Sequence, residues 1–383
     1  MSSTFGTRLS VTLFGQSHSA GVGCVVEGLP SGFPVDLDAL ESFVSRRAPG
    51  KAPWDTPRKE QDSLRILSGL NPDGVTCGAP LAAIIENTNT RSRDYSNMLT
   101  VPRPGHADFT AWAKWHGAQD VPGGGHFSAR LTGPLCAAGG IALQVLEARG
   151  IRVAAHILEA GGVGDEPFCL LDNSPEAQAR LSAQMDALGD GRSLPVIDEE
   201  RGEEIAETIM AARRDKDTVG GVVECVATGI PAGVGSPMFD GMESNIARAV
   251  FGIPAVKGID FGLGFEATRV RGSRNNDPYE VRDGRCVPRT NNAGGILGGI
   301  TTGAPLFFRV GFKPISSIYL EQDSVDLTTM TPAKLTVKGR HDTCPAVRGT
   351  PVVEAVCALV VLDSILSWPP DPETSATHEN LSE

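Results

Sequence analysis

Three short segments combine a histidine with glycine, serine, arginine or aspartate, residue types that bind anions and transfer protons. They span residues 15–18, 103–108 and 339–342, and their histidines are His18, His106 and His341. The chain has only 7 histidines, so their placement in such segments is informative. A fold that brings the three segments together would form an anion-binding pocket able to move protons near neutral pH.

A glycine-rich loop adds a second feature suited to anions. Gly123, Gly124 and Gly125 precede a predicted helix whose first residues include Arg130. Backbone N–H groups at a helix start, next to an arginine, bind anions readily. A glycine loop before a buried helix is more often a plain connection, so the loop by itself leaves both interpretations open.

The composition limits the classes of partner. The 383 residues are 40% hydrophobic, enough for a large core in one big domain or two smaller ones. A formal net charge of −12 argues against a nucleic-acid or anionic-membrane partner. The apolar run 11–14 is too short for a signal peptide, and we expect no membrane-spanning stretch free of charge and turn residues. We therefore predict a cytoplasmic protein that captures anions with a local arginine cluster.

The cysteines and histidines do not predict a metal site. The 8 cysteines include no Cys-x-x-Cys pair and mostly lie among apolar residues, as reduced core thiols do. The sequence contains no His-Glu-x-x-His. We expect neither disulfides nor bound zinc, and a metal-dependent hydrolase lacks its ligand set.

Hydrophobic periodicity predicts the strands and helices that position these segments. We expect strands at 10–14, 23–29, 64–67, 80–85 and 154–158. Asp36 is a good N-cap for a helix with Leu37, Leu40, Phe43 and Val44 on its apolar face. Further helices are predicted at 128–149, ended by Gly150, and at 175–188, 199–214, 242–251 and 352–366. The last is apolar nearly all round and is expected in the core, whereas the polar tail 369–383 is expected to be disordered.

An internal echo favours an architecture of two halves. Residues 25–32 and 222–233 both contain Val-Val-Glu followed by Gly-x-Pro-x-Gly, and each copy leads into a predicted helix. A central helical layer against strands from both halves would follow. The alternative is that such turns simply recur in a chain with 45 glycines, and the sequence leaves this open.

The order of eight motifs along the chain resembles that of chorismate synthase. They lie at 14–18, 46–50, 86–92, 103–108, 123–130, 292–299, 313–317 and 339–342. The resemblance runs from about residue 5 to 367. It implies an α+β fold, a β-α-β sandwich with a helical layer between antiparallel sheets and two pseudo-related halves, in a single domain over residues 1–367. It also implies a homotetramer.

The same resemblance implies an activity. It is a lyase reaction, the anti-1,4-elimination of phosphate from 5-enolpyruvylshikimate 3-phosphate to give chorismate. Reduced FMN (FMNH2) acts as a cofactor without net redox change. Breaking a C–O bond to phosphate and removing a carbon-bound hydrogen requires an acid near the leaving group, an electron-rich partner and a proton acceptor.

Individual roles follow from the resemblance. His18 matches the histidine that protonates the departing phosphate, and His106 matches the one that governs protonation of the flavin ring. Asp342 matches the aspartate that works with the flavin N5 to take the hydrogen, and Ser17 and Ser128 match serines that orient it. Taken alone, either histidine also fits a hydrogen-bonded turn residue.

The resemblance further implies residues that bind the cofactor, the substrate or both. For FMN they are Arg47, His126, Phe127, Ser128, Gly298, Lys313, Pro314, Ile315, Ser316, Ser317 and Arg340. For the carboxylates and phosphate of the substrate they are Arg46, Arg47, Arg103 and Arg130. A solvated surface arginine is the alternative for any one of these four, and a salt bridge to Arg340 is the alternative for Asp342.

Several positions depart from the family pattern. Gln16 and Ser19 replace a common glutamate and glycine, Leu131 a common glutamate, and Pro254 a common asparagine near the flavin. His126 and Phe127 replace a common arginine and serine. Because His126 exchanges a permanent cation for a titrating one, we hypothesise that ligand binding weakens as pH rises through the histidine pKa.

The source of reduced flavin is a separate expectation. Arg47 matches a position linked to nicotinamide binding, but a neighbouring arginine of that pattern is absent around Pro53. We therefore expect an external flavin reductase, with NADPH only as a reductant of FMN.

Two other functions remain as alternatives. A protein of this fold could bind flavin or a phosphorylated metabolite without turnover, although the retained catalytic residues count against it. A nicotinamide dehydrogenase would use Gly161, Gly162 and Gly164, which do not fit the full Gly-x-Gly-x-x-Gly spacing, so a simple loop is favoured there.

Overall fold

The computed structural model describes residues 3–50, 52–54, 63–88, 96–188, 194–337 and 341–369. The predicted cofactor contact Arg340 lies outside these residues, as do part of the motif at 86–92 and the tail from residue 370 onward.

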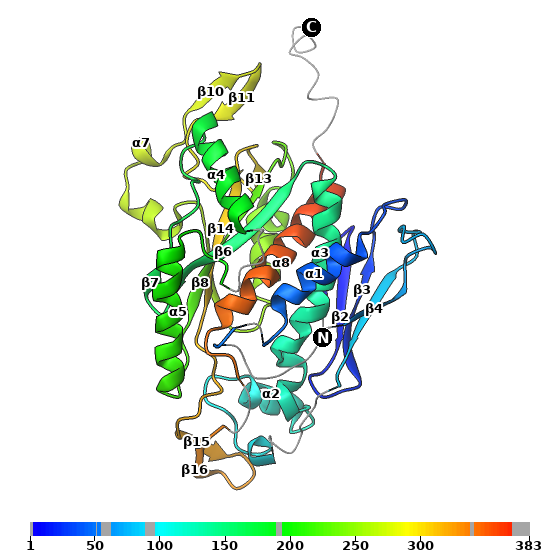
Figure 1. The fold of residues 1–383 in the computed structure, drawn as a ribbon, viewed down its shortest axis with the longest axis vertical. Helices are drawn as coiled ribbons and strands as arrows, with labels where there is room; N and C mark the ends of the chain where they lie inside the picture. Colours follow the sequence, from blue (N-terminus) through cyan, green and yellow to red (C-terminus); the bar gives the residue numbers. More distant parts are fainter. Residues whose placement is uncertain are drawn as a thin grey trace.

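Two five-stranded antiparallel sheets enclose a layer of helices (Figure 1). The first sheet has the order β1-β2-β3-β5-β4, with strands Thr4–Phe5, Ser10–Gly15, Gly21–Glu27, Leu81–Glu86 and Leu64–Ser68. The second has the order β7-β6-β8-β14-β9, with strands Val163–Gly164, Arg152–Ala160, Gly221–Thr228, Leu306–Phe312 and Val256–Phe261. Between them lie α1 (Leu37–Arg47), α3 (Thr132–Glu147) and α8 (Pro345–Ser367). The predicted α+β sandwich is confirmed.

The two halves follow the same path. Apart from inserted elements, chiefly between β6 and β8 and between β9 and β14, the order β2-β3-α1-β4-β5-α3 in the first half matches β6-β8-α6-β9-β14-α8 in the second, where α6 is Met242–Val250. The echoed segments form the central strands β3 and β8. Gly28 and Gly229 follow these strands at φ 85° and 81°, and a Cβ on either would overlap a neighbouring backbone carbonyl oxygen. The shared topology therefore favours two related halves over chance recurrence of a turn.

The two long core helices differ from their predicted bounds: α3 is shorter than the predicted 128–149, because Ala129–Leu131 forms a separate 3-10 turn, and α8 is longer than predicted. The helix α8 begins at Pro345, not near 352, and carries Pro351 within it. Segments Ala129–Glu147 and Pro345–Ser367 are long and apolar enough to span a membrane by length and composition. Both contain charged and turn-forming residues, Arg130 and Pro134 in the first and Arg348 and Pro351 in the second, so neither contradicts the expectation of no such stretch free of charge and turn residues. In the fold, 78% and 89% of these windows are buried, because a helix between two sheets meets apolar side chains on both sides.

Close contact between the two long helices holds the halves together. Gly139 of α3 packs so tightly on α8 that a Cβ would overlap Ala355. The N-terminal segment is tied to the other end of α8, where the buried carboxylate of Asp363 accepts hydrogen bonds from the backbone N–H groups of Thr7, Arg8 and Leu9. These contacts satisfy a buried charge and fix the edge of the first sheet.

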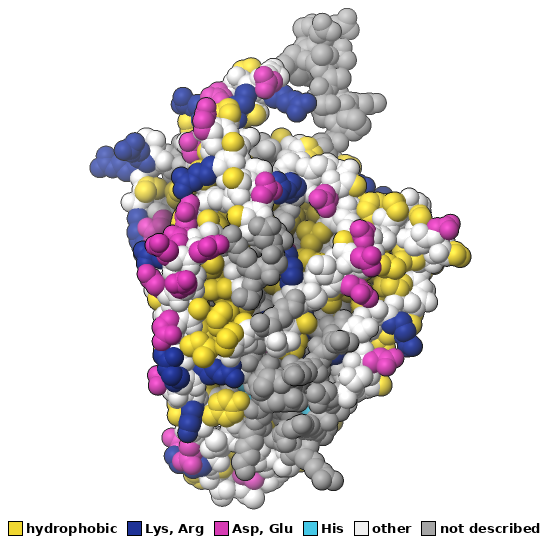
Figure 2. All heavy atoms as spheres, in the orientation of Figure 1, with side chains coloured by type: hydrophobic (Ala, Val, Ile, Leu, Met, Phe, Trp, Pro, Cys, Tyr) yellow, Lys and Arg dark blue, Asp and Glu magenta, His cyan; other side chains and the backbone are white. Residues whose placement is uncertain are grey.

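The remaining elements lie outside the sandwich. The helices α4 (Pro175–Leu188) and α5 (Glu199–Arg214) lie over the outer face of the second sheet, and acidic and basic side chains intermingle along that side (Figures 1 and 2). The shorter elements are α2 (Asp108–Trp115), η2 (Pro122–Phe127), η3 (Ala129–Leu131), η4 (Met238–Asp240), η5 (Gly264–Arg269), α7 (Gly272–Asn275), β10 (Tyr279–Arg282), β11 (Arg285–Pro288), β12 (Ile296–Leu297), β13 (Ile300–Thr301), β15 (Gln322–Asp326) and β16 (Thr331–Leu335).

Candidate active site

A cavity of about 510 Å³ opens where the two halves meet. The first half contributes the end of α1 and the glycine-rich loop, and the second half contributes residues 251–256, 312–317 and the start of α8. Most of the predicted site residues line it: Arg47, Arg103, His106, His126, Phe127, Ser128, Arg130, Lys313, Pro314, Ile315, Ser316, Ser317 and Asp342, together with Pro254 and His341. This size suits a small-molecule ligand.

Positive charge dominates the lining. Its cationic side chains are Arg47, Arg103, Arg130, Lys313 and Arg348, and Asp342 is the only carboxylate among the lining residues that the structure describes. A chain of net charge −12 thus gathers cations in one place. Such a cavity attracts anions by charge and by multiple N–H donors.

Arg103, His106 and Asp108 form a tight group on one wall. Arg103 donates to Asp108 from Nε at 2.7 Å and from NH2 at 2.9 Å, and its NH1 donates to Ser317 Oγ at 3.1 Å. His106 Nδ1 donates to Asp108 Oδ1 at 2.6 Å. Since the Arg103 guanidinium is already engaged, its main effect is to hold this group, and less of it remains for the substrate than predicted.

The pKa values in this group follow from its contacts. Burial favours a higher pKa for Asp108, but hydrogen bonds from Arg103 and His106 outweigh burial and hold that pKa well below its usual range. Burial lowers the pKa of His106, and the charges of Arg103 and Lys313 add to this effect against the opposing influence of Asp108. The wall therefore presents an ionised Asp108 and a neutral His106 near neutral pH.

Lys313 is fixed across the cavity from the second half. Its Nζ donates to the carbonyl oxygen of Gly105 and, at 3.2 Å, to Ser316 Oγ, while Ser316 donates to the same carbonyl at 2.8 Å. Burial and the charge of Lys257 lower the pKa of Lys313. The segment 313–317 is thereby joined to the histidine-bearing segment 103–108.

Asp342 pairs with a residue that the sequence analysis did not single out. Arg348 NH1 donates to Asp342 Oδ2 at 2.5 Å, and Arg348 Nε donates to the carbonyl oxygen of Arg47 at 2.7 Å. The signal available in the sequence was an arginine in the first turns of the last helix, six positions after the aspartate. The ion pair expected with Arg340 involves a residue outside the described ranges, and the observed partner is Arg348.

The turn that carries His18 is held by polar contacts. Ser19 Oγ donates to the carbonyl oxygen of Gln16 at 2.9 Å, and Asn87 Nδ2 donates to that same oxygen at 3.0 Å. Asn87 Oδ1 in turn accepts from Arg130 Nε at 2.9 Å. Ser19, a departure from the family pattern, therefore helps to build the turn.

Ser17 and His18 lie directly behind Gly123, which lines the cavity. A Cβ on Gly123 would overlap Ser17 Oγ and lie 2.7 Å from His18 Cδ2. Within the described structure the buried Ser17 Oγ makes no hydrogen bond. Ser128 caps the following turn by accepting from the backbone N–H of Arg130 at 3.3 Å. The backbone of the glycine loop thus lies between these two side chains and the cavity.

His126 lines the cavity, but both of its ring nitrogens already have partners. Nδ1 donates to the carbonyl oxygen of Gly15 at 2.8 Å, and Nε2 lies 2.8 Å from Ser3 Oγ. These contacts join the loop to the first sheet. The hypothesis that His126 titration controls ligand binding stays a prediction, and this arrangement favours a structural role.

Besides Ser17 and His18, two further predicted contacts, Arg46 and Gly298, are not brought to the cavity. Arg46 points away from it and donates to Glu354 of α8 from NH1 at 2.6 Å and from NH2 at 2.8 Å. Consecutive helical residues point about 100° apart, so Arg47 faces the cavity while Arg46 faces α8. Gly298 lies in the turn between β12 and β13, outside the cavity lining.

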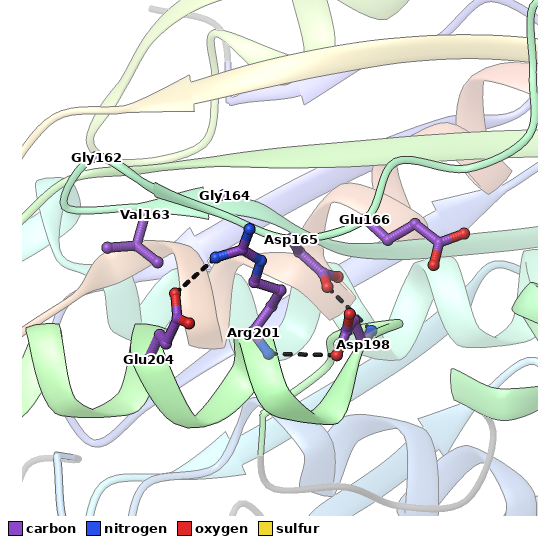
Figure 3. A pocket seen from close by; sticks show the side chains of 8 residues that line it. All are labelled: Gly162, Val163, Gly164, Asp165, Glu166, Asp198, Arg201 and Glu204. Carbon is purple, nitrogen blue, oxygen red and sulfur yellow. Dashed lines mark hydrogen bonds and ion pairs between the residues drawn. The ribbon is translucent and has the colours of Figure 1, made fainter.

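A second hollow, of about 600 Å³, is less suited to chemistry (Figure 3). Its charged side chains already have protein partners: Arg201 donates to Glu204 at 2.8 Å, Asp165 accepts from the backbone N–H of Asp198 at 3.0 Å, and Glu166 accepts from Arg180 at 2.6 Å. Gly161 and Gly162 connect the antiparallel strands β6 and β7, not a strand and a helix. This loop therefore lacks the geometry of a dinucleotide-binding turn.

The described residues also contain no group of His, Cys, Asp and Glu side chains suited to a metal ion. The cysteines within these ranges are free thiols.

Comparisons of the sequence and the structure with known proteins point to one family. The profile of the family described as chorismate synthase matches residues 9–366. A chorismate synthase of Lancefieldella parvula is 54% identical, over 96% of this chain and 97% of the relative. Those of Pyrococcus abyssi and Korarchaeum cryptofilum are 44% and 42% identical, each over 94% of this chain and 97% of the relative. A crystal structure of chorismate synthase superimposes with a TM-score of 0.72 at 26% identity, over 94% of this chain and 92% of that one.

Proposed function

Because the chain belongs to the chorismate synthase family and is therefore a lyase, we propose that it eliminates phosphate from 5-enolpyruvylshikimate 3-phosphate to give chorismate. Reduced FMN is the proposed cofactor, without net redox change. The observation that carries the proposal is the cationic cavity in which His106 and Asp342 lie together.

Substrate binding is assigned to cations from both halves. The substrate carries a phosphate and carboxylates, and Arg47, Arg130 and Arg348 supply N–H donors for such groups. Burial of Arg47 and Arg130 strengthens their attraction for an anion, because water screens them little. Arg103 acts through Asp108 and His106 more than by direct contact.

Proton transfer is assigned to three side chains. His18 lies behind the glycine loop at Gly123 and outside the cavity lining, and it is assigned as the proton donor to the departing phosphate on the family resemblance. Asp342, ion-paired with Arg348, accepts the proton released from carbon. His106 provides a neutral ring on the cavity wall.

The residues present fit a flavin phosphate and its ring. Lys313, Ser316 and Ser317 offer polar groups on one side, and the aromatic ring of Phe127 lines another part of the cavity. The buried, unbonded hydroxyl of Ser17 is available as a donor or acceptor close to this space. Bound reduced flavin would supply electron density to the reacting substrate.

We also propose the oligomeric state, the cellular location and the source of reduced flavin. Large apolar side chains lie exposed on the outer part of the second half, namely Met238, Phe239, Phe265, Tyr279 and Val281, which supports association into a homotetramer. A cytoplasmic location and an external flavin reductase are expected of the monofunctional form, with NADPH reducing FMN only in the bifunctional alternative. The long apolar helices are packed in the core, which agrees with a soluble metabolic enzyme.

The decisive experiment is an anaerobic assay with 5-enolpyruvylshikimate 3-phosphate and chemically reduced FMN, following chorismate and phosphate. Equimolar products with prereduced flavin alone would establish the monofunctional enzyme, and equal activity with NADPH and oxidised FMN would establish the bifunctional one. Flavin binding without product would instead support a binding protein of the same fold.

A further inference from the structure

Asp108 lies where it can control the protonation of His106 without reaching the cavity. It is the first residue of α2, its carboxylate is buried, and it is absent from the cavity lining. Its Oδ1 accepts from His106 Nδ1 at 2.6 Å, and its Oδ2 accepts from the backbone N–H and the Nε of Arg103 at 3.1 and 2.7 Å. We propose that Asp108 is a positioning residue that keeps hydrogen on His106 Nδ1 and leaves Nε2 as a hydrogen-bond acceptor.

The choice of ring nitrogen follows from the charges. An ionised carboxylate can only accept hydrogen bonds, and Arg103 can only donate them. A contact between Asp108 and His106 therefore requires hydrogen on Nδ1. Since a neutral imidazole carries one hydrogen, Nε2 keeps its lone pair.

The surroundings keep the ring neutral and oriented. The charged groups that face it are Asp108, Arg103 and Lys313. On the side of Nε2 lies the glycine loop, where a Cβ on Gly124 would be 3.3 Å from Nε2. The absence of that Cβ leaves room beside an acceptor nitrogen. The ligand group that this nitrogen would bind is an N–H or O–H donor, and its assignment to the reduced cofactor rests on the proposed function.

Arg103 also determines what the loss of Asp108 would do. Its NH2 lies 3.1 Å from His106 Nδ1 and is directed to Asp108 in the native protein. In Asp108→Asn the guanidinium would donate to Nδ1 instead, so the hydrogen would move to Nε2. A group that only supported the fold would not invert the ring in this way.

The test determines which nitrogen of the His106 ring carries hydrogen. It uses NMR of the full-length protein with 15N-labelled histidine, between about pH 6 and 8. The His106 signal is assigned by its loss in His106→Gln. We expect the Nδ1–H form in the wild type and the Nε2–H form in Asp108→Asn, with an unchanged ring in Asp172→Asn, whose carboxylate instead binds Ser174 near the start of α4. An Nε2–H form in the wild type overturns the proposal even if Asp108→Asn does not fold.

A kinetic measurement distinguishes failure of this proposal from failure of the proposed function. With reduced FMN, Asp108→Asn should lose about 100-fold or more in kcat with a smaller change in KM. If the wild type makes no chorismate, the proposed function fails while the NMR result still stands. An Asp108→Asn variant with the native ring form and native kcat overturns the positioning role.

Discussion

The side chain of Arg348 joins Asp342, at 2.5 Å, to the end of α1, where it donates to the carbonyl oxygen of Arg47 at 2.7 Å. One guanidinium thus links the proposed proton acceptor to a helix of the other half. Both side chains of this ion pair are largely shielded from water.

Arg348→Met should therefore weaken both activity and stability. We expect kcat to fall by about 10-fold or more, and the free energy of unfolding to fall by about 1–3 kcal/mol because Asp342 loses its partner. Steady-state assay and urea unfolding measure the two effects. The control Arg201→Met removes an exposed pair with Glu204 and should cost less than about 0.5 kcal/mol. Native kcat in Arg348→Met would exclude the role.

Gly123→Ala tests whether the glycine loop positions the turn that carries His18 beside the cavity. The new methyl group would overlap Ser17 Oγ, so we expect the Ser17–His18 turn to shift and turnover to fall by about 10-fold or more. Gly150→Ala is the control, since it has a comparable φ of 76° and no atom within 4 Å of the new Cβ. Both should lose about 1 kcal/mol from backbone strain, but only Gly123→Ala should lose activity. Equal activity in the two variants would argue against a site at this turn.

A buried charge cluster predicts how stability depends on pH. His156 Nδ1 contacts Asp165 at 2.9 Å, and its Nε2 contacts Glu224 at 3.2 Å. Burial acts to lower the pKa of His156, but hydrogen bonds to the two carboxylates outweigh it and raise the pKa above 6.5. The stabilisation is fully present below the unfolded pKa of 6.5 and is lost as pH rises through the higher folded pKa.

Unfolding by urea at several pH values above 6.5 measures this loss. We expect the free energy of unfolding to decline across this range in the wild type. His156→Gln should remove this part of the decline and cost about 2–4 kcal/mol at lower pH, since it leaves a buried carboxylate poorly paired. The exposed His116, changed to asparagine, should keep the wild-type slope. A His156→Gln profile parallel to the wild type would contradict the assignment.

Adjacent arginines of α1 should separate into two phenotypes. Arg46→Met leaves buried Glu354 without its bidentate partner and should cost about 2 kcal/mol of stability with an unchanged KM. Glu354→Gln in the same chain should restore part of that loss in a double-mutant cycle. Arg47→Lys should raise KM several-fold, because lysine cannot reproduce the guanidinium donors in the cavity. A raised KM in Arg46→Met would place that residue in substrate binding after all.

Local sequence pattern predicted the core helices and most strands of the first sheet, but in the second sheet it predicted only the strand at 154–158, within β6. Asp36 was expected to cap α1, and its side chain accepts from the backbone N–H of Ala39. Apolar periodicity likewise identified α3 and α8, but not the first turns of α8, because Pro345 and Pro351 interrupt the pattern that marks a helix. The order of the motifs was enough to indicate the family.

Pairing between distant side chains was decided only by the tertiary structure. His156, Asp165 and Glu224 meet because β6 pairs with β8 and the chain after β7 folds back, and no local motif marks them. Arg348 and Asp108 were missed as partners for the same reason. Propensity and periodicity depend on neighbours along the chain, whereas the partner of a buried charge depends on which elements pack against it. The sequence by itself therefore indicated the family, the core helices and most cavity residues, and the packing of the two halves decided that Arg47 lines the cavity while Arg46 pairs with a carboxylate.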